Sequence, residues 1–355
     1  MAEIDSINRD FTKYDQVAKS HTYRLAEHTT DEFDEEYEIA TLDFEPFLHG
    51  DAGDKARFAQ AFAAALQAIG FAVLVGHGVD SALYDDVHDT TLDLFTSTSL
   101  AQKMRYRAER FGSVNQGYFP IEETSDIHPD LVEGWVWCRR AFDIPQRREG
   151  PFRPEDFWPG PQYEPQLRRL VLAHEQLFKP IAQAMLQGLG CDPHLLDEKL
   201  TQTNFGLRLN YYPPMTAKQD GSGAARLLGH EDVDLFTILP ASRTDGLQVW
   251  NHRSGKWVRM RAPPGSIIIN TGDYMQRISN DLLPSTTHRV GKPSNRSHLA
   301  EPRISFPIAV YLWENEILEA LPGLGQPKYE PVKAITFHTR STSKFYGDDY
   351  AVDVA

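Results

Sequence analysis

The sequence LLGHEDVDLFTILP, residues 227–240, contains a histidine and a carboxylate two positions apart, His230 and Asp232. Leu235, Thr237 and Leu239 follow in the apolar alternation that is typical of a β-strand. Residues i and i+2 of a strand project from the same face, about 7 Å apart. The stretch therefore predicts two metal-capable side chains on one face of a strand, while a surface loop that enters a strand would read the same way.

The triplet alone does not distinguish the two interpretations, because a chain with 13 histidines contains about one His-x-Asp triplet by chance. The surrounding sequence is needed to distinguish them. From Leu207 onward nearly every segment has the pattern of a short strand, and turn signals such as RTDG, HRSG and PPG separate the segments. The expected strands are LRLNYY, LFTIL, GLQVW, KWVRM, GSIIIN, STTHRV and ISFPIAVYLW. Short strands at this spacing predict a sandwich or a jelly roll.

The preceding half of the chain alternates helices with strands. Apolar residues at helical spacing predict a helix that Asp54 caps and that ends at Gly70. Pro180 is expected to kink a later helix. His77, in a turn, is expected to be structural. The expected elements are strands at 39–44 and 71–75 and helices at 55–70, 81–95 and 166–188.

These patterns divide the chain into three parts that we expect to form one cooperative unit. Residues 1–38 are polar, with an acidic run at 31–38, and form an N-terminal extension. Residues 39–200 form a helical and mixed region. Residues 201–355 form a strand-rich core with a C-terminal segment.

Composition excludes several classes of function. The net charge of -14 disfavours nucleic-acid binding, and no apolar run approaches the length of about 18 residues that suggests a membrane span. Only two cysteines occur, Cys138 and Cys191, and they are far apart. The N-terminal sequence lacks a basic and an apolar signal region. We therefore expect a cytoplasmic protein whose partner is a small molecule.

A second histidine, His288, lies in another expected strand, 56 residues after Asp232. Two histidines and one carboxylate on one face of an octahedron leave three positions open, as non-haem Fe(II) oxygenases require. The same three residues could bind zinc. The absence of cysteine ligands and the motif that follows favour iron.

That motif is Arg303-Ile304-Ser305, 15 residues after His288, at the start of the last long strand. Strand alternation places the guanidinium of Arg303 and the hydroxyl of Ser305 on one face. An arginine fork is suited to bind a carboxylate with two hydrogen bonds. An Arg-x-Ser pair by itself is common on surfaces, but after a second metal histidine it indicates a cosubstrate anchor.

In these motifs the chain resembles the isopenicillin N synthase-like branch of the non-haem Fe(II), 2-oxoglutarate-dependent dioxygenases. The likeness extends from about Ile39 to the C-terminal region. GFAVLVGHGV resembles the N-terminal signature of the branch, and NYYPP at 210–214 resembles its Asn-Tyr-Tyr-Pro motif. HEDVDLFTILP, GLQVW, PPGSIIINTGDYMQRISN, STTHRV and RIS follow in the family order.

The resemblance implies an α+β fold, with a double-stranded β-helix (jelly-roll) core and N-terminal and flanking helices. It also implies a dioxygenase that oxidises an unactivated C–H bond of a small molecule with Fe(II), 2-oxoglutarate and O2, giving succinate and CO2, with ascorbate as a reductant. Hydroxylation is the default outcome, and desaturation or cyclisation are variants. By the resemblance, His230, Asp232 and His288 bind Fe(II), and Arg303, Ser305, Tyr212 and Asn210 bind 2-oxoglutarate. Tyr211, Thr237, Asn270, Gly272 and Asp273 are expected to serve packing or turns.

Two departures from the family keep alternatives open. The segment between His288 and Arg303 is a few residues longer than usual, and Glu231 stands where many relatives have threonine. Glu231 also occurs in isopenicillin N synthase, so an Fe(II) oxidase or cyclase that does not use 2-oxoglutarate is an alternative. Asn210-Tyr211-Tyr212-Pro213 favours the dioxygenase, and Glu231 is expected near the ligands or on the surface rather than as a ligand. A non-catalytic jelly-roll binding or sensing module is a second alternative.

The substrate is expected to contact the aromatic and basic middle segment and residues near Phe337 to Phe345. Aromatic walls with a few polar groups are typical of small-molecule sites. Taken singly, each of these residues is more often part of the core or the surface than a substrate contact. The candidates are Tyr118, Phe119, Trp135, Trp137, Arg139 and Arg140.

Overall fold

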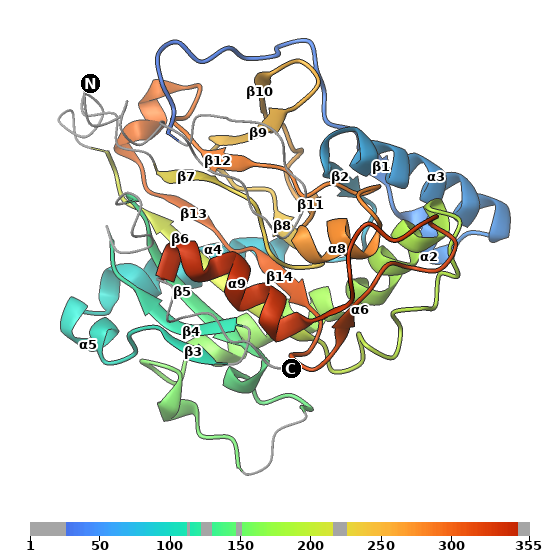
Figure 1. The fold of residues 1–355 in the computed structure, drawn as a ribbon. Coiled ribbons are helices and arrows are strands. Elements are labelled where there is room, and N and C mark those ends of the chain that lie inside the picture. Colours follow the sequence, from blue (N-terminus) through green and yellow to red (C-terminus); the bar gives the residue numbers. More distant parts are fainter. Residues whose placement is uncertain (1–25, 112–113, 122–129, 147–150, 216–225, 347–355) are drawn as a thin grey trace.

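Two β-sheets that face each other form the centre of the computed structural model (Figure 1). The structure describes residues 26–111, 114–121, 130–146, 151–215 and 226–346, without the side chains of 110–111 and 343–346. A two-stranded ribbon of β15 (Ile317–Leu318) and β16 (Val332–Lys333) lies outside both sheets. The facing sheets confirm the predicted double-stranded β-helix core.

The larger sheet combines strands from both halves of the chain. Its central strand β6 pairs with β5 from the N-terminal half and with β13 and β14 from the C-terminal half. The spatial order is β1 (Thr41–Asp43), β2 (Phe71–Val75), β11 (Ile267–Thr271), β8 (Phe236–Pro240), β14 (Ile308–Tyr311), β6 (Asn204–Tyr212), β5 (Glu133–Cys138), β4 (Val114–Phe119) and β3 (Glu109–Phe111), with β13 (Arg303–Ser305) beside β6.

The smaller sheet consists of strands from the C-terminal half, and it carries the two histidines of interest. Its order is β10 (Lys256–Arg259), β9 (Leu247–Asn251), β12 (His288–Val290) and β7 (Leu227–His230). All pairs in it are antiparallel. Because β7 and β12 are neighbours, residues that are far apart in the sequence meet at the end of this sheet.

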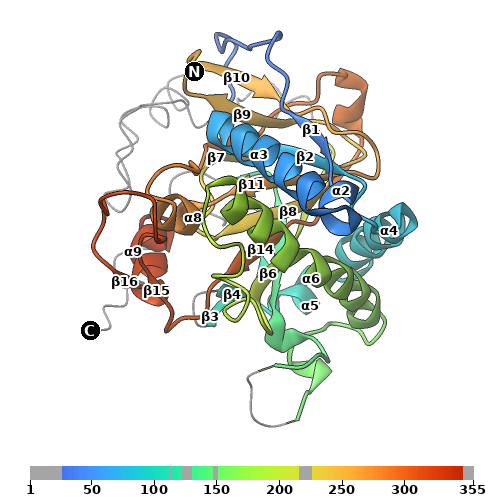
Figure 2. The ribbon, with the colours of Figure 1, turned by 90° about the vertical axis from the view of Figure 1, so that its right-hand side faces the viewer.

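The helices pack mainly on the outer face of the larger sheet. Figure 2 shows α3 and α6 side by side on one flank of the molecule, and their residues share one buried cluster with the outward side chains of β2, β5, β6 and β8. The helices are α2 (Glu45–His49), α3 (Ala52–Ile69), α4 (Ser81–Ser97), α5 (Leu100–Met104), α6 (Tyr163–Gly188), α8 (Asp273–Ile278) and α9 (Ala334–Tyr346), with short 3-10 turns at Arg139–Ala141, Pro154–Asp156 and Arg296–Ala300.

Helix α3 ends as its sequence predicts, but it begins at Ala52, three residues before the expected start. The cap is Asp51 rather than Asp54, because the Asp51 side chain accepts a hydrogen bond from the Asp54 N–H at 2.9 Å while the Asp54 carboxylate accepts from the Asp51 N–H at 3.2 Å. The helix stops at Gly70, whose φ of 72° suits glycine. A Cβ on Gly70 would lie 2.6 Å from the Pro284 carbonyl oxygen, so glycine also permits close packing against the segment before β12.

Helix α6 is the longest helix of the described chain and supplies much of the core. It starts at Tyr163, three residues before the expected Gln166, and it continues through Pro180 to Gly188. Leu170, Phe178 and Ile181 are fully buried on the side that faces the sheet. Each such side chain contributes about 1.5–3 kcal/mol to stability by leaving water. The helix thereby holds the outer face of the sheet rigid.

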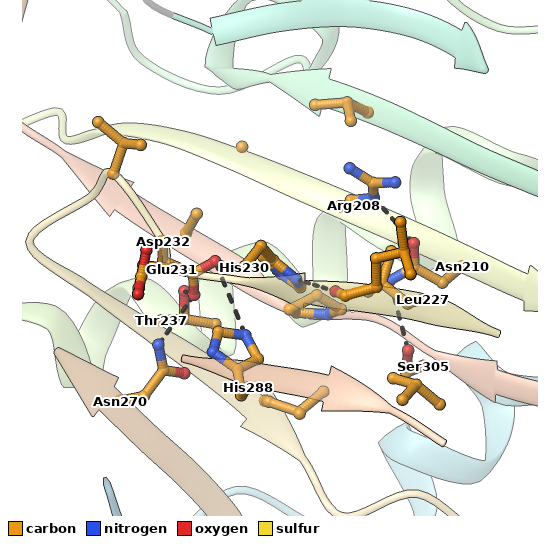
Figure 3. A pocket seen from close by; sticks show the side chains of 18 of the residues that line it. Arg208, Asn210, Leu227, His230, Glu231, Asp232, Thr237, Asn270, His288 and Ser305 are labelled. Atoms are coloured by element: carbon orange, nitrogen blue, oxygen red, sulfur yellow. Dashed lines mark hydrogen bonds and ion pairs between the residues drawn. The ribbon is translucent and has the colours of Figure 1, made fainter. Parts of the chain in front are cut away.

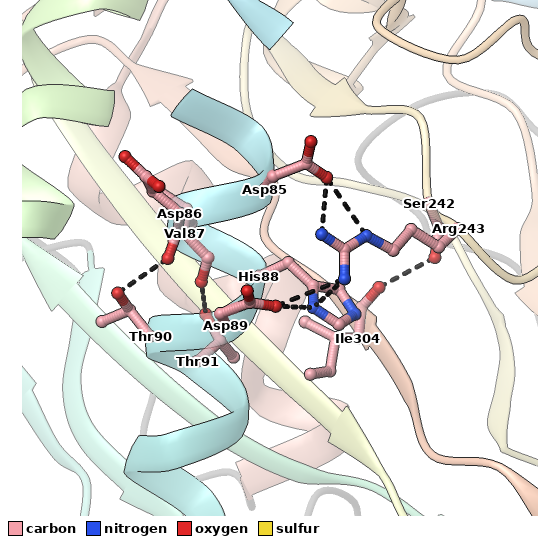
Figure 4. A network of polar contacts seen from close by, with 10 residues as sticks. All are labelled: Asp85, Asp86, Val87, His88, Asp89, Thr90, Thr91, Ser242, Arg243 and Ile304. Atoms are coloured by element: carbon pink, nitrogen blue, oxygen red, sulfur yellow. Dashed lines mark hydrogen bonds and ion pairs between the residues drawn. The ribbon is translucent and has the colours of Figure 1, made fainter. Parts of the chain in front are cut away.

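Helix α4 is tied to the loop that follows β8, as Figure 4 shows. Arg243 donates hydrogen bonds to Asp85 at 2.5 Å and to Asp89 at 3.3 Å, and the Ser242 hydroxyl donates to the carbonyl of Ile304 in β13 at 2.8 Å. Exposed ion pairs of this kind add little stability. Their effect is to fix the position of the loop, whose Thr244 carbonyl contacts the site described below.

Two sequence expectations are wrong in detail. The expected strand ISFPIAVYLW is interrupted at Phe306 and Pro307, which divide it into β13 and β14, because proline cannot donate a ladder hydrogen bond. Gly272 and Asp273 do not form a strand-to-strand turn but open helix α8.

Among the helices of the described residues, none is long and apolar enough to span a membrane. Cys138 and Cys191 are buried free thiols.

Candidate metal centre

His230, Asp232 and His288 converge at the open end of the smaller sheet. His230 is the last residue of β7 and lies opposite His288 in the register with β12. Asp232 lies in the loop after β7, so the two residues of the His-x-Asp triplet do not share one strand as predicted. The Asp232 Oδ1 atom is 3.8 Å from His230 Nε2 and 3.9 Å from His288 Nε2. Three candidate ligand atoms therefore surround one point.

The backbone orients both imidazole rings for metal binding. The Nδ1 atom of His230 lies 2.8 Å from the Leu228 carbonyl oxygen, and that of His288 lies 3.1 Å from the Thr286 carbonyl oxygen. A carbonyl can only accept a hydrogen bond, so Nδ1 carries the proton in each ring. Each Nε2 then presents its lone pair to the point shared with Asp232, as metal-binding histidines do.

The carboxylate of Asp232 is also fixed so that one oxygen stays available. Its Oδ2 atom accepts hydrogen bonds from the Asn270 amide and from the Thr237 hydroxyl, each at 2.8 Å. Thr237 and Asn270 were expected to serve packing or turns, but both hold the carboxylate (Figure 3). Only Oδ1 is directed toward the histidines. These contacts determine which oxygen can bind a metal.

A second buried carboxyl group, Asp234, stands behind the first. The Thr237 hydroxyl lies 2.6 Å from Asp234 Oδ2, but its single hydrogen serves one acceptor at a time. Burial, together with the charge of Asp232, raises the pKa of Asp234 well above its ordinary value. In its protonated form Asp234 can donate to Thr237, which leaves the Thr237 hydroxyl free to donate to Asp232. A short chain of hydrogen bonds thus supports the candidate ligand.

Helix α8 fixes the loop that contains Asp232. The N–H groups of Asp273 and Tyr274 donate to the carbonyls of Asp232 and Asp234 at 2.8 and 3.0 Å. A Cβ on Gly272 would lie 2.5 Å from the Asp234 carbonyl oxygen, so only glycine allows this approach. Gly272 and Asp273, which were expected to form a turn, therefore support the loop that contains Asp232.

The charges of the three residues suit a divalent cation at neutral pH. Burial and then the neighbouring His288 lower the pKa of His230 to about 4, with a contribution from the charge of Arg208. Burial opposes ionisation of Asp232, but His288, His230 and the donors on Oδ2 outweigh it and lower its pKa. The site at neutral pH consequently offers a neutral His230 and a carboxylate. That donor set, with open positions on one side, matches a non-haem iron site.

Glu231 is buried beside this centre. Its Oε1 atom accepts a hydrogen bond from the Thr287 hydroxyl at 2.6 Å. It lies on the wall of the cavity and is absent from the group of ligand atoms that lie within 4.8 Å of one another. Glu231 therefore lies near the candidate ligands, which is one of the two positions that were expected, and not on the surface.

The four residues predicted to bind a cosubstrate face one another on neighbouring strands. Arg303 lies opposite Tyr212 and Ser305 opposite Asn210 in the register between β13 and β6. The Asn210 amide donates to the Ser305 hydroxyl at 3.4 Å, and the Arg303 guanidinium lies 5.1 Å from the centre of the Tyr212 ring. All four line the same cavity as the metal centre.

The guanidinium of Arg303 is only partly satisfied by the protein. Its Nε donates to the Thr244 carbonyl at 3.2 Å, whereas its Nη1 is buried without a hydrogen-bond partner among the described residues. Arg226, also buried, lies close enough that its pKa is lowered to about 10, by burial and by the charge of Arg303. The charge of Asp245 acts on both arginines, but of the two cations only Arg303 lines the cavity, and its free buried donor favours an anionic ligand there. A carboxylate fits this end of the cavity.

The cavity itself lies between the two sheets and has a volume of about 270 Å³. That volume is near the lower end of the range for small-molecule sites, roughly 300–1,000 Å³. Beyond the metal centre its wall is mainly apolar, with side chains from β4, β5, β14 and α9. The wall residues there are Val114, Phe119, Val136, Ala309, Tyr311, His338 and Thr342.

The structure brings only one of the six expected substrate residues to this wall, Phe119. Trp135 and Trp137 project from the other face of β5 and stack on each other, with ring centres 5.1 Å apart. Tyr118 donates to Glu133, and Arg139 is paired with Glu175. Arg140 also lies away from the cavity wall. Strand alternation is the reason, because Val136 and Phe119 take the inward positions.

The expectation of wall residues near Phe337 to Phe345 agrees with the structure, because His338 and Thr342 of α9 line the cavity. Phe337 itself is buried in the core, and the side chain of Phe345 lies outside the described residues. Arg208 is a further wall residue that was not predicted. The signal was available, because Arg208, Asn210 and Tyr212 alternate along one strand and so share a face.

Two protein-family models match the chain. The model described as the 2OG-Fe(II) oxygenase superfamily matches residues 203–310, which include all three candidate metal ligands. The model described as the N-terminal region of a non-haem dioxygenase in morphine synthesis matches residues 39–161. The two matches together span both halves of the larger sheet.

Similar proteins carry consistent descriptions. A 2-oxoglutarate-Fe(II) type oxidoreductase of Metarhizium majus is 26% identical over 341 residues, covering 87% of this chain and 88% of the relative. A 2-oxoglutarate-dependent dioxygenase of Monascus ruber is 28% identical over 268 residues, covering 71% of this chain and 79% of the relative.

Solved structures show the same fold. A protein of Caulobacter crescentus, described as of the 2OG-Fe(II) oxygenase family, is 28% identical with a TM-score of 0.69, covering 84% of this chain and 96% of that one. A full-length protein of Neurospora crassa, solved in complex with alpha-KG and thymine, is 23% identical with a TM-score of 0.76, covering 86% of this chain and 97% of that one.

Proposed function

The chain belongs to the 2OG-Fe(II) oxygenase superfamily, and from that premise we propose which residues bind the metal, the cosubstrate and the substrate. The protein is a 2-oxoglutarate-dependent dioxygenase that uses Fe(II), 2-oxoglutarate and O2. His230, Asp232 and His288 bind the Fe(II). The observation that carries this assignment is that His230 Nε2 and His288 Nε2 approach Asp232 Oδ1 while Asp232 Oδ2 is held by other residues.

Arg303 binds the distal carboxylate of 2-oxoglutarate, with Ser305, Tyr212 and Asn210 around it. The buried Nη1 of Arg303 has no partner among the described residues, and it lies beside a strand whose Asn210 amide already contacts Ser305. A bidentate arginine–carboxylate pair would satisfy that donor. The register of β6 and β13 keeps these groups on one wall, so the cosubstrate is oriented before the substrate enters.

When bound, Fe(II) with 2-oxoglutarate activates O2, and the overall change is R–H + 2-oxoglutarate + O2 to R–OH + succinate + CO2. The chain itself supplies orientation and the exclusion of water. His230 and His288 keep their Nε2 lone pairs aimed inward through the carbonyls of Leu228 and Thr286. The apolar wall from β4, β5 and β14 holds a C–H bond near the metal and shields it from solvent. Hydroxylation is the outcome we propose, with desaturation or cyclisation as variants.

The substrate is a small molecule. The Neurospora crassa protein, which shares the fold, is described in complex with thymine. The cavity of about 270 Å³ limits the size of the molecule that fits beside the cosubstrate. The order of motifs supports assignment to the isopenicillin N synthase-like branch. The Glu231 hydrogen bond to Thr287 supports a role beside the ligands rather than a change to a 2-oxoglutarate-independent oxidase.

Two further features belong to this proposal. The helical region 39–200 and the core 201–355 fold as one unit, because β2 pairs with β11 and β5 pairs with β6. Fluorescence and circular dichroism should show a single unfolding transition, and two separate transitions would contradict the proposal of one unit.

The protein acts in the cytoplasm, where its two free thiols remain reduced. Cell fractionation tests that location.

The test of the function is product formation from a complex mixture. Purified protein with Fe(II), 2-oxoglutarate and ascorbate is incubated with cell metabolites under isotopically labelled O2, beside the matched variant His230→Ala. We expect succinate and a metabolite that gains one labelled oxygen atom only with the unaltered protein. Oxygen consumption with a metabolite but without 2-oxoglutarate would instead support the oxidase, and no succinate with any addition would support a binding module.

A further inference from the structure

Arg208 stands out on the cavity wall because it is a cation that is neither a candidate metal ligand nor one of the four proposed cosubstrate residues, although it donates to one of them, Asn210. It projects from β6 on the same face as Asn210 and Tyr212. Together with Arg303, it is one of two arginines among the described residues that line the cavity. Figure 3 shows it beside Asn210, near His230.

The protein leaves the Arg208 guanidinium largely unpaired. Its Nε donates to the Asn210 side-chain oxygen at 2.8 Å, and its Nη2 is buried with no hydrogen-bond partner in the described part of the chain. The described residues offer it no ion pair; the aromatic ring of Phe119 lies 5.6 Å away. A buried donor on a charged group costs free energy unless an acceptor meets it. The wall is therefore incomplete without an anionic or strongly accepting group.

The surroundings of Arg208 make room for its guanidinium. Gly134, on the neighbouring strand β5, faces it, and a Cβ on Gly134 would lie only 3.3 Å from Nη2. The rest of the nearby wall is mainly apolar, from Val114, Phe119 and Val136, with Asn115 and Asn210 as polar members. A single cation in an apolar wall favours a ligand with one negative group on an apolar body.

Arg208 and Arg303 address different carboxylates. Arg303 lies opposite Tyr212, and Arg208 is four residues earlier on the same strand. At about 3.3 Å of rise per residue, the two positions are about 13 Å apart along the sheet. The backbone of Arg208 thus lies further along β6 than Asn210 and Tyr212, while its Nε donates to the Asn210 side chain.

We propose that Arg208 pairs with the carboxylate of the substrate, so that the substrate is a small monocarboxylic acid with an apolar body whose C–H bond is oxidised. This inference rests on the proposed function, and it adds the substrate class. A planar guanidinium forms two parallel hydrogen bonds with a carboxylate, which no amide or ester can reproduce. Phe119, Val136 and Tyr311 contact the apolar body.

The test measures binding, so that it does not depend on turnover. The full chain, loaded with Mn(II) and 2-oxoglutarate without oxygen, is titrated by calorimetry with 3-phenylpropionate, octanoate and their primary amides. We expect at least one acid to bind about 10- to 100-fold more tightly than its amide. Arg208→Met should lose that preference, Arg208→Lys should keep part of it, and the exposed control Arg57→Met should keep all of it.

A second variant tests the proposal without replacing Arg208, so its result does not depend on the folding of Arg208→Met. Gly134→Ala leaves Arg208 in place but pushes its Nη2 aside, so the affinity for the acid should fall about threefold while that for the amide stays the same. Equal binding of acid and amide by the unaltered protein, or binding of neither, overturns the proposal. So does an Arg208→Met variant that binds the acid normally, or one that loses affinity for 2-oxoglutarate more than for the acid.

Failure of the proposed function would give a different pattern of results from failure of this inference. A separate assay measures succinate from 2-oxoglutarate with Fe(II) and O2. Absence of succinate, together with an acid preference that depends on Arg208, would refute the proposed chemistry and leave this inference standing. Succinate formation without any acid preference would refute this inference and leave the proposed chemistry standing.

Discussion

The two ends of the cavity differ in how completely the protein satisfies the polar atoms of the side chains that face a ligand. At the metal end, Asp232 Oδ2 has two donors and both histidine Nδ1 atoms have carbonyl partners. At the substrate end, Nη2 of Arg208 and Nδ1 of His338 are buried without partners among the described residues. Ligand side chains that are held by other residues keep their geometry for a constant ligand, whereas unpaired groups can bind a ligand that varies. The difference separates the general chemistry of the site from its selectivity.

Removal of a ligand from the metal end should have the largest effect. His288→Ala should lower iron content and succinate formation to background, at least about 100-fold, because the remaining two ligands cannot hold the metal. Metal analysis and a succinate assay measure both effects. The exposed control His49→Ala should be normal. A His288→Ala protein that keeps iron and activity would show that the metal lies elsewhere.

The next effect concerns Arg303, the proposed cosubstrate anchor. Arg303→Met removes a guanidinium with a free buried donor, so KM for 2-oxoglutarate should rise about 10- to 100-fold, in keeping with the loss of charge-assisted hydrogen bonds. Iron content should stay within about twofold. Succinate formation at varied 2-oxoglutarate concentration gives KM. An unchanged KM would remove Arg303 from the cosubstrate site.

A smaller effect is expected where a residue supports the metal end but does not bind the metal. Asn270→Ala removes one donor from Asp232 Oδ2, so the carboxylate can rotate and the affinity for Fe(II) should fall about 10-fold. Titration with Fe(II) without oxygen measures this affinity. Asn295→Ala, on an exposed loop, is the matched control. Equal affinities in the two variants would mean that the support of Asp232 is dispensable.

The smallest effect concerns a buried histidine at the substrate end. Burial lowers the pKa of His338 to about 3, below the value of about 6.5 expected in the unfolded chain. The folded state then binds fewer protons, so stability is complete above about pH 6.5 and declines as the pH falls toward 3. Between pH 7 and 6, His338 should remove about 0.7 kcal/mol from the free energy of unfolding.

Urea unfolding of metal-free protein at the two pH values measures this loss. His338→Phe should lose about 0.7 kcal/mol less than the unaltered protein over that interval, since phenylalanine does not titrate. Identical losses in both proteins would show that His338 is accessible to protons in the folded state, and the two ends of the cavity would then be less different than the structure indicates.

The metal end could be predicted from the sequence because its chemistry fixes residue types and their order. His230, Asp232, His288 and Arg303 are recognisable from motifs alone. The substrate end could not, because a one-residue change of register in β5 exchanges Trp135 and Trp137 for Val136 on the inner face. The sequence indicated the segment near Phe337 to Phe345 that contains His338, but no motif identified that residue. Asn270 and Thr237 have common residue types, and only the fold reveals that they hold Asp232.

An experimental structure of the protein with Mn(II) and 2-oxoglutarate, prepared without oxygen, would locate both ligands at once. We expect a metal bound by His230 Nε2, Asp232 Oδ1 and His288 Nε2, with the distal carboxylate of 2-oxoglutarate on Arg303 and Ser305 and with Arg208 left free for another ligand. A metal bound by other residues, or 2-oxoglutarate paired with Arg208 instead of Arg303, would contradict the assignment of the two ends.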